Sequence, residues 1–427
     1  MNSVLLSVVI INVILALLFS LGAAPILVWM ERRVAGLIQD RLGPNRCHIK
    51  GFRLGGLIQS FADMLKLVFK EDFQSKSIKQ GFFFSLAPVI VFASAFLTFM
   101  VMPFADTLVI GTQQFRMQGL PIDLGVLWFL AFAGLSVYGI MIGGWASNNK
   151  YSLLGSVRAA AQVISYEAAM GLSLVSVLIT YGSIDLVKIV NVQGETFLGI
   201  VPMWGIVLQP IAGLIFIVTA FAEANRTPFD IAEGESEIVG GFHTEYSAMR
   251  FGLFFVGEYV AMSASSALIV TLFFGGYHLP YLNSQTLQTH MELFLGVLMI
   301  ALPLVSFFFV RWMLRNNRFQ AKADIRNRES AVLLKGIVLL NALIVLFLGA
   351  LLFFGLSQTG SNIATAVVQI ATFAFKLLLM NFVFVWVRWT LPRFRYDQLQ
   401  DLGWKVLMPL AIANIFITAT VVVVFGV

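Results

Sequence analysis

Six carboxylates lie within one short segment of a chain that is otherwise very apolar. The segment, residues 222–252, reads AEANRTPFDIAEGESEIVGGFHTEYSAMRFG, whereas only 12% of all 427 residues are charged. Two further carboxylates, Glu167 and Glu258, fall inside apolar runs long enough to cross a bilayer. A charge at that depth costs at least about 2.5 kcal/mol, so we expect these groups to be protonated, paired or hydrated. A row of such acids can pass protons along water, which makes proton conduction or proton-coupled chemistry the first hypothesis. The six acids are Glu223, Asp230, Glu233, Glu235, Glu237 and Glu245.

Simpler explanations compete with proton conduction. A single buried glutamate can be satisfied by a helix end or a basic partner, and Lys376, also inside an apolar run, is a candidate counter-ion. The acidic segment alone could be a solvated surface run. Against this, apolar residues are interleaved with its acids, and the segment continues directly into Glu258. Tyr166 and Tyr259, which adjoin Glu167 and Glu258 in the chain, are candidate proton relays.

Composition excludes several classes of site and fold. The lone cysteine, Cys47, excludes a disulfide framework and a cysteine-ligated iron–sulfur cluster in this chain. The four histidines lack metal-ligand spacing, and no glycine-rich phosphate loop is present, so no metal or nucleotide site is expected. With 59% hydrophobic residues, a soluble multi-domain protein would need many buried helices without polar faces. The histidines are His48, His243, His278 and His290.

Apolar runs between charged or Pro/Gly breaks predict an all-α polytopic membrane protein with about ten transmembrane helices. If the segment after the first span is cytoplasmic, all 28 Lys and Arg except Arg116, Lys188 and Lys376 fall in or beside inner loops. The positive-inside rule then predicts that both termini face away from the cytoplasm or matrix. The spans are expected near 4–28, 82–101, 124–146, 159–180, 203–222, 252–274, 293–312, 336–355, 366–387 and 405–425.

One inner segment is predicted to form an amphipathic interfacial helix near residues 54–70. Its apolar and polar residues alternate with helical period, so it could lie flat at the membrane surface and floor an opening between spans. The alternative is a loop helix that packs on the other spans. The expected apolar face is Leu57, Ile58, Phe61, Leu65 and Val68, and the expected wet side is Asp63, Lys66 and Lys70.

Five long motifs are unlike generic transmembrane sequence. They are WMERRVAGLIQDRLGPNR (29–46), GGLIQSFADMLKLVFKE (55–71), GGWASNNKYSLLGSVRAAAQVISYE (143–167), FAEANRTPFDIAEGESEIVGGFHTEYSAMRF (221–251) and LPRFRYDQLQDLGWKVLMPL (391–410). In these motifs the chain resembles the H subunit of proton-pumping NADH–quinone oxidoreductase, respiratory complex I, whose mitochondrial counterpart is NADH dehydrogenase subunit 1. The resemblance runs in order from about residue 5 to 282 and again from 366 to 425.

The resemblance implies a subunit that forms the membrane part of the quinone chamber and couples quinone reduction to proton translocation. The enzyme would be the whole oxidoreductase, with no redox centre in this chain. Quinone would be the substrate, and FMN and iron–sulfur clusters would belong to partner subunits. The expected partners are the quinone-site subunits of the redox arm, the membrane-arm subunits and lipid. The bacterial inner membrane is the expected location.

Carried onto this sequence, the resemblance implies roles for two sets of residues. For Arg32 and Arg33, simple positive-inside anchoring is the alternative to quinone binding. The expected quinone-binding residues are Arg32, Arg33, Arg41, Phe61, Asp63, Lys66, Arg226, Phe229, Phe242 and Arg250. The expected proton path comprises Tyr166, Glu167, Glu223, Asp230, Glu233, Glu235, Glu237, Glu245 and Glu258.

The chain departs from the family pattern in one region. The family usually has eight core spans, whereas two additional spans and a basic inner loop are predicted here within residues 283–365. The expected organisation is a core of six spans with the quinone-chamber loops (1–282), an inserted helix pair (283–365) and the last two core spans (366–427). An inserted pair leaves the orientation of the flanking spans unchanged.

Two other functions remain open. One is the membrane subunit of an energy-converting hydrogenase or a ferredoxin-linked relative, which shares this ancestry. The other is a stand-alone proton or cation transporter, which would show an inverted repeat and paired discontinuous helices. The chain has no convincing repeat of that kind.

Overall fold

The computed structural model is 75% helical. In its described part, nine helical segments are long and apolar enough to cross a membrane, and a shorter apolar helix, α9 (Pro210–Glu223), lies where a tenth span is expected. The predicted all-α polytopic membrane fold is confirmed. The structure describes residues 3–49, 53–197, 199, 201–232, 234–316 and 325–425.

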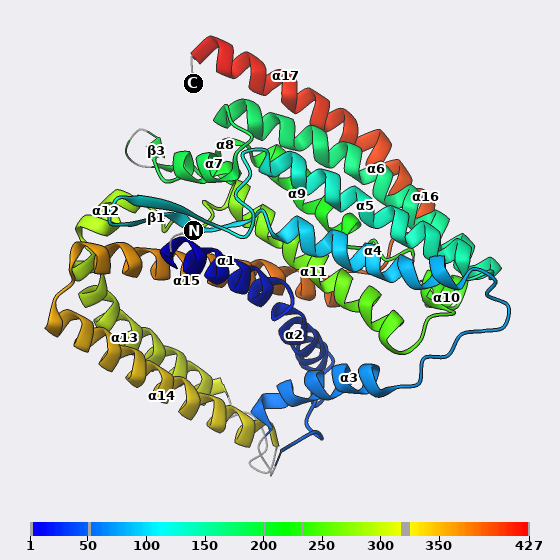
Figure 1. Cartoon of the computed structure of the whole chain (residues 1–427), viewed down its shortest axis with the longest axis horizontal. Coiled ribbons are helices and arrows are strands. Elements are labelled where there is room, and N and C mark those ends of the chain that lie inside the picture. Colours follow the sequence, from blue (N-terminus) through cyan, green and yellow to red (C-terminus); the bar gives the residue numbers. More distant parts are fainter. Residues whose placement is uncertain are drawn as a thin grey trace.

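The long helices run side by side along one direction, so the molecule has two ends (Figure 1). Both chain termini lie toward one of them, which we call the β end, and the opposite end is called the α3 end (Figure 1). The β end carries β1 (Pro103–Ile110), β2 (Gln113–Gln118), α7 (Leu186–Gln193), β3 (Thr196–Phe197), β4 (Val201–Pro202) and α12 (Ser284–Thr289). The α3 end carries α3 (Leu57–Phe69), α10 (Glu235–Ile238) and α16 (Tyr396–Asp401).

The first expected span is a pair of helices, α1 (Ser3–Ser20) and α2 (Ala23–Ile38), that break at Gly22. The predicted amphipathic helix follows as the 3-10 turn η1 (Leu54–Gly56) and α3. Gly56 has a φ of 96°, and a side chain there would overlap the carbonyl of Pro44, so only glycine fits this turn. Of the apolar residues on α3, Ile58 packs inward, whereas Phe61, Leu65 and Val68 are exposed.

A tightly packed bundle forms the core of the molecule. Its helices approach closely where glycine faces a neighbour: a Cβ at Gly139 would lie 2.5 Å from Val91 Cγ2, and one at Gly144 would overlap the Ser156 hydroxyl. Small residues permit such approach between membrane helices. The bundle consists of α4 (Gly81–Phe99), α5 (Gly125–Ala146), α6 (Lys150–Tyr181), α8 (Gly205–Leu208), α9, the 3-10 turn η2 (Gly241–His243) and α11 (Ala248–Phe273).

Two C-terminal helices complete the core. α15 (Gln358–Thr390) packs along α2, α11 and β1, and the Phe384 and Phe221 rings stack 4.0 Å apart between α15 and α9. A π-helical turn, Leu402–Leu407, leads into α17 (Met408–Phe425), which packs on α6.

Lys376 on α15 does not pair with a carboxylate, so its expected role as a counter-ion is wrong. Its Nζ donates to the carbonyl oxygens of Phe274, Gly276 and His278 at 2.7, 3.0 and 2.6 Å. An ammonium group has three N–H donors. These backbone acceptors, which follow the end of α11, therefore satisfy it completely.

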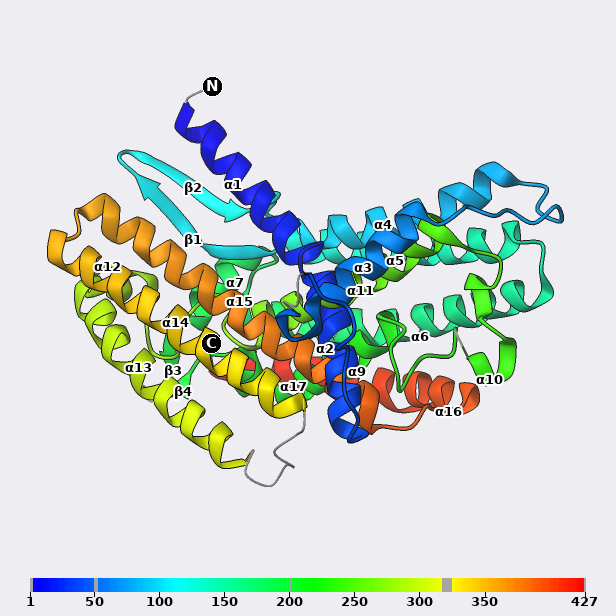
Figure 2. The same ribbon diagram turned by 90° about the horizontal axis from the view of Figure 1, so that it is seen from below.

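The inserted pair forms a helical hairpin of α13 (Met291–Asn316) and α14 (Ile325–Phe354). The two helices lie side by side in both views (Figures 1 and 2), on the far side of α15 from the core bundle. Asn341 Nδ2 donates to the Leu302 carbonyl at 3.0 Å and joins them. Residues 317–324, in the expected basic loop, lie outside the described residues.

Candidate functional site

The centre of the polar site is Glu31 on α2, a residue absent from the sets predicted from the sequence. Arg388 Nη1 lies 2.8 Å from Glu31 Oε1, and Arg226 Nη1 lies 3.5 Å from Glu31 Oε2. The Tyr259 hydroxyl donates to Glu31 Oε2 at 2.7 Å. Glu31 thus joins α2, α11, α15 and the turn after α9. The only sequence signal for it is one acid between apolar residues and arginines in the motif WMERRV.

Arg226 links Glu31 to a second carboxylate. Its Nη2 lies 3.9 Å from Glu258 Oε2, and its guanidinium lies over the Tyr259 ring at 4.2 Å from the ring centroid. His243 Nε2 lies 4.0 Å from Glu258 Oε1. Arg226 is only 5% exposed, and removing one partner from such a buried pair leaves an uncompensated charge. The charges of Glu31 and Glu258 are therefore coupled through Arg226.

A turn after α9 places Arg226 in this position. Asn225 adopts a φ of 48°, a conformation that asparagine tolerates better than most residues, and Pro228 cannot continue the helix. Gln162 Nε2 on α6 donates to the Ala222 carbonyl at 2.8 Å and to Asn225 Oδ1 at 3.3 Å. These bonds fix the end of α9, where Glu223 lies, against α6.

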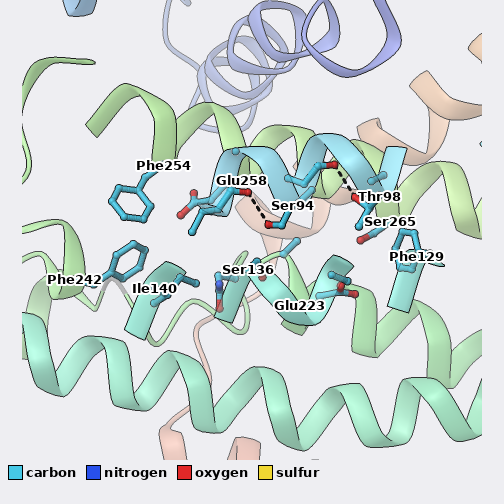
Figure 3. Close-up of a pocket in the computed structure, with 18 residues that line it drawn as sticks. Ser94, Thr98, Phe129, Ser136, Ile140, Glu223, Phe242, Phe254, Glu258 and Ser265 are labelled. Atoms are coloured by element: carbon cyan, nitrogen blue, oxygen red, sulfur yellow. Dashed lines mark hydrogen bonds between the residues drawn. The ribbon is translucent and has the colours of Figure 1, made fainter. Parts of the chain in front are cut away.

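A cavity between α4, α5, α9 and α11 lies beside this cluster (Figure 3). It leaves about 40 Å³ for water-sized molecules, which is enough for ordered water and far below the several hundred Å³ of a typical ligand pocket. Glu258 and Glu223 both line it, with Ser94 and Ser136 between them (Figure 3). Its other polar lining residues are Thr98, Asn225 and Ser265.

Glu223 provides the strongest sign that this cavity holds water. Its Oε2 atom is buried and has no hydrogen-bond partner in the described part of the chain. A buried carboxylate oxygen without a partner is costly, and water in a polar cavity is the usual solution. The hydroxyls of Ser94 and Thr98 donate to carbonyls of their own helix, so their oxygens remain able to accept from water.

Glu167 on α6 lies beyond this cavity. Its Oε1 occupies space beside Gly134 on α5 and would be 2.8 Å from a Cβ added there. Glu167 does not line the cavity, but it lies beside Gly134, and the preceding residue, Ala133, lines the cavity from α5. Glu258 and Glu223 therefore share the cavity, and Glu167 lies beside the helix that forms one of its walls.

Tyr166 and the other expected acids occupy separate positions. The Tyr166 hydroxyl donates to the Leu399 carbonyl of α16 at 2.9 Å, and Tyr166 does not line the cavity. Asp230 pairs with Arg393 at 2.9 Å. The acids of segment 222–252 therefore have separate partners and do not form one cluster. Glu237 pairs with Arg158 at 2.8 Å, and Glu245 accepts from Asn149 at 2.8 Å. Glu233 and the side chain of Glu235 lie outside the described residues.

Some of the expected quinone-binding residues lie together on α2 and α3, and the others lie apart. Arg32 on α2 pairs with Asp63 on α3, and Phe61 and Lys66 lie on the same helix. Arg33 Nε donates to the Gly55 carbonyl at 3.1 Å, so it fixes the turn that leads into α3. Elsewhere, Arg41 donates to Gln39 at 2.6 Å, Phe229 stacks with Phe394, Phe242 lines the cavity beside Phe254, and Arg250 pairs with Asp72 at 3.1 Å.

Outside the spans, His278 and Asp397 have lowered pKa values. Burial lowers the pKa of His278, near the β end, to about 4. A hydrogen bond from Arg395 lowers the pKa of Asp397, an exposed residue of α16, to about 2. Within the described ranges, no three His, Cys, Asp or Glu side chains are grouped as a metal site.

Known proteins are similar to this chain along nearly its whole length. A family model described as NADH dehydrogenase matches residues 10–326 and 330–419. The NADH-quinone oxidoreductase H subunit of Bdellovibrio bacteriovorus is 37% identical over 431 residues, which cover 96% of this chain and 95% of that protein. The H subunit of Salinibacter ruber is 40% identical, with 95% and 93% covered. NADH-quinone oxidoreductase subunit 8 of Rhodothermus marinus is 40% identical, with 94% of each covered. The chain therefore belongs to the NADH dehydrogenase family, as a membrane subunit of NADH–quinone oxidoreductase.

Proposed function

We propose that this subunit forms the membrane part of the quinone chamber and couples quinone reduction to proton translocation. The single observation that carries this proposal is the spatial series from Glu31 through Arg226 and Glu258 into the cavity that Glu223 lines. A buried series of carboxylates with room for water is what proton transfer within a membrane requires. Partner subunits of the redox arm would hold FMN and the iron–sulfur clusters.

Quinone would bind outside the cavity, along α2 and α3. The cavity leaves too little space for a quinone ring, whereas Phe61, Leu65 and Val68 form an exposed apolar surface on α3. The Arg32–Asp63 pair lies at the boundary between α2 and α3. A redox-arm subunit packed over this surface would close the chamber. Arg33, Arg41, Lys66, Phe229, Phe242 and Arg250 remain proposed members of the chamber wall or its approaches.

Arg226 would transmit the charge change. Quinone reduction consumes protons, and withdrawal of a proton from Glu31 would restore its negative charge. Arg226 would then be shared between two negative carboxylates, so it would stabilise the charged form of Glu258 less. Glu258 would therefore take up a proton from the cavity more readily. Reprotonation of Glu31 would reverse the effect and release a proton toward Glu223 and Glu167. Tyr166 and the remaining expected acids would act at the edges of this path, except Glu237, which pairs with Arg158 and would stand outside it.

Family membership and the placement of basic residues support a proposal for the cellular setting. We propose the bacterial inner membrane, since the relatives named above are bacterial, with both termini on the non-cytoplasmic side. In the proposed organisation, residues 1–282 and 366–427 carry the coupling machinery. Residues 283–365 form a peripheral addition, which fits the place of α13 and α14 outside α15 (Figure 2).

The test is Glu258→Gln in the intact complex, with Glu237→Gln as the matched control. Glu237 is a half-exposed acid paired with Arg158, away from the cavity. We expect Glu258→Gln to leave NADH oxidation by a soluble artificial acceptor unchanged and to lower quinone-dependent proton translocation about 100-fold. The control should retain near-normal translocation. Unchanged quinone reduction and pumping in Glu258→Gln would rule out this proton path.

A further inference from the structure

α11 has polar residues on two opposite faces, and the proton path proposed above uses only one. Glu258 and Ser265 face the cavity. Tyr259, Ser263 and Ser266 follow a spacing of four and three residues, which places them together on another face. Tyr259 shows where this face points, because its hydroxyl bonds Glu31 of α2. The second face therefore looks toward α2 and α15.

Three helices meet at Glu31, and two of them, α11 and α15, pack on each other between this point and the β end. Tyr259 of α11 and Arg388 of α15 both contact the Glu31 carboxylate of α2. A step of seven residues toward the β end is about 10.5 Å along a helix and returns to the same face. On α11 that step leads from Tyr259 to Ser266, and on α15 it leads from Arg388 to Asn381. Lys376, five residues further along α15, bonds the carbonyls that follow α11, so Ser266 and Asn381 lie between two contacts of the α11–α15 pair.

The polar groups at this level are buried and lack partners. Ser263, Ser266 and Asn381 are all fully buried. Both serine hydroxyls, and both the Nδ2 and Oδ1 atoms of Asn381, have no hydrogen-bond partner within the described part of the chain. Thr271 of the same helix differs, because its hydroxyl donates to the Ala267 carbonyl at 2.7 Å. A dry site would leave four polar atoms unsatisfied, at roughly 1–3 kcal/mol each.

We propose that ordered water occupies this junction of α11 and α15, held by Ser263, Ser266 and Asn381. The groups are neutral and offer both donors and acceptors, a combination that suits water rather than a cation or an anion. Water here forms a second branch of the network that begins at Glu31, on the opposite side of α11 from the Glu258 cavity.

The branch gives Glu31 a hydrated neighbour that does not depend on Arg226. Ser263 follows Tyr259 by one turn of α11, on the same face. The Tyr259 hydroxyl, which bonds Glu31, can pass a proton by giving the one it donates and taking another from water at the junction. Water at the junction can accept an excess proton while Glu258 is charged. This role rests on the proposed coupling function, whereas the presence of water rests only on the buried unpartnered groups.

The first experiment is cryo-electron microscopy of the intact complex, at a resolution that shows ordered water in the Glu258 cavity. We expect density within hydrogen-bonding distance of Asn381 and of Ser263 or Ser266. Absence of density there, with water visible in the cavity, overturns the proposal. So does a map in which the Asn381 amide bonds the backbone directly.

The second experiment is Asn381→Leu, which keeps the side-chain volume and removes the amide. We expect the junction density to disappear and quinone-dependent proton translocation to fall about threefold to tenfold, with soluble-acceptor NADH oxidation unchanged. Ser176→Ala is the matched control, because Ser176 is also fully buried and unpartnered but lies on α6. If Asn381→Leu does not assemble, Ser266→Ala replaces it.

The outcomes separate this inference from the coupling proposal. Junction water that disappears in Asn381→Leu without any loss of translocation shows hydration without a branch, and overturns the branch. A Glu258→Gln variant with normal pumping, together with junction water in the map, removes the coupling proposal and leaves the water site intact.

Discussion

The core helix α11 and the inserted hairpin have opposite surroundings, although the hairpin helices are the more apolar. In α11, 72% of the residues in the most apolar window are buried inside the chain, against 6% in each of α13 and α14. α11 carries Glu258, Tyr259 and two unpartnered serines, whereas the described side chains of the hairpin meet each other mainly through apolar contacts and Asn341. Apolar content alone thus indicates only that a helix inserts into the membrane. The burial of polar side chains is what marks the part that performs chemistry.

Glycine shows the same contrast between the two regions. In the core, Gly144 allows α5 to approach α6 so closely that a Cβ would lie 2.7 Å from the Ser152 carbonyl. In the hairpin, a Cβ at Gly296 or Gly336 would meet nothing within 4 Å. One residue type therefore supports dense packing in the first region and has no packing role within this chain in the second.

The largest difference between the regions is expected when each loses one carboxylate. Glu31→Gln leaves buried Arg226 and partly exposed Arg388 without their shared partner, which costs about 3–5 kcal/mol, mainly through Arg226. We expect poor assembly of the complex, and at least a 100-fold loss of quinone reduction in what assembles. The measurements are native electrophoresis and NADH–quinone activity.

The matched control for this change is Glu292→Gln in the hairpin. Glu292 Oε1 only accepts a bond from the Leu356 N–H at 3.3 Å, which a glutamine oxygen can also accept. Assembly and activity should therefore stay normal. Equal loss in both variants would contradict the division into a chemical core and a passive hairpin.

The positions of the spans and of the amphipathic helix follow from local pattern, and the described structure has helices there, although α9 is shorter than a span. The carboxylates Glu223 and Glu258 also stand out locally, as acids at the end of and within apolar runs. Helical period and hydropathy are properties of neighbouring residues, which is why they can be read from the sequence. Glu31 could not be identified in this way, since its partners Arg226 and Arg388 are far from it along the chain. Because Glu31 directly precedes Arg32 and Arg33, the segment around it looks like an ordinary basic anchor at the membrane surface.

Lys376 was misassigned for a related reason. A lysine within a span suggests a carboxylate partner. The acceptors of Lys376 are instead backbone carbonyls, which every residue has and which a sequence therefore cannot identify. The division of the acidic segment among Arg158, Arg393 and Asn149 was equally hidden. Each of these pairings depends on how distant helices are placed against one another.

A pH-dependent loss of stability is expected in the core near the β end. His278 is 3% exposed, and burial lowers its pKa from the ordinary 6.5 to about 4. Between these values the unfolded chain binds a proton that the folded one does not, so stability is complete above pH 6.5 and falls as the pH drops to 4. The expected loss is about 3 kcal/mol, which a thermal unfolding series would measure.

His278→Gln should flatten this pH dependence. His290→Gln, at an exposed residue where the hairpin begins, should leave it unchanged. A pH profile that follows His290 instead would assign the acid sensitivity to the hairpin and reverse the comparison.

A smaller effect is expected from Gly134→Ala, which acts on Glu167 without removing its charge. The new Cβ would lie 2.8 Å from Glu167 Oε1, so the carboxylate must move away from α5. We expect a decrease of about tenfold in proton translocation and only a small change in assembly, since overpacking by one methyl costs about 1–3 kcal/mol.

Gly171→Ala is the control on the same helix as Glu167, because a Cβ there meets nothing within 4 Å. It should translocate protons normally. If the two alanine variants behave alike, the space beside Gly134 does not matter to Glu167, and Glu167 loses its assigned place after Glu223.

The smallest effect compares one substitution in both regions. Gly336→Ala in α14 adds a methyl in open space and removes a flexible residue from a helix, so stability should rise by up to about 1 kcal/mol with unchanged activity. Gly144→Ala, within α5, should instead cost about 1–3 kcal/mol through overlap with α6. Thermal unfolding of both variants measures the difference. A destabilised Gly336→Ala would mean that another membrane subunit packs closely against the hairpin, which would then be an interface rather than a lipid-facing addition.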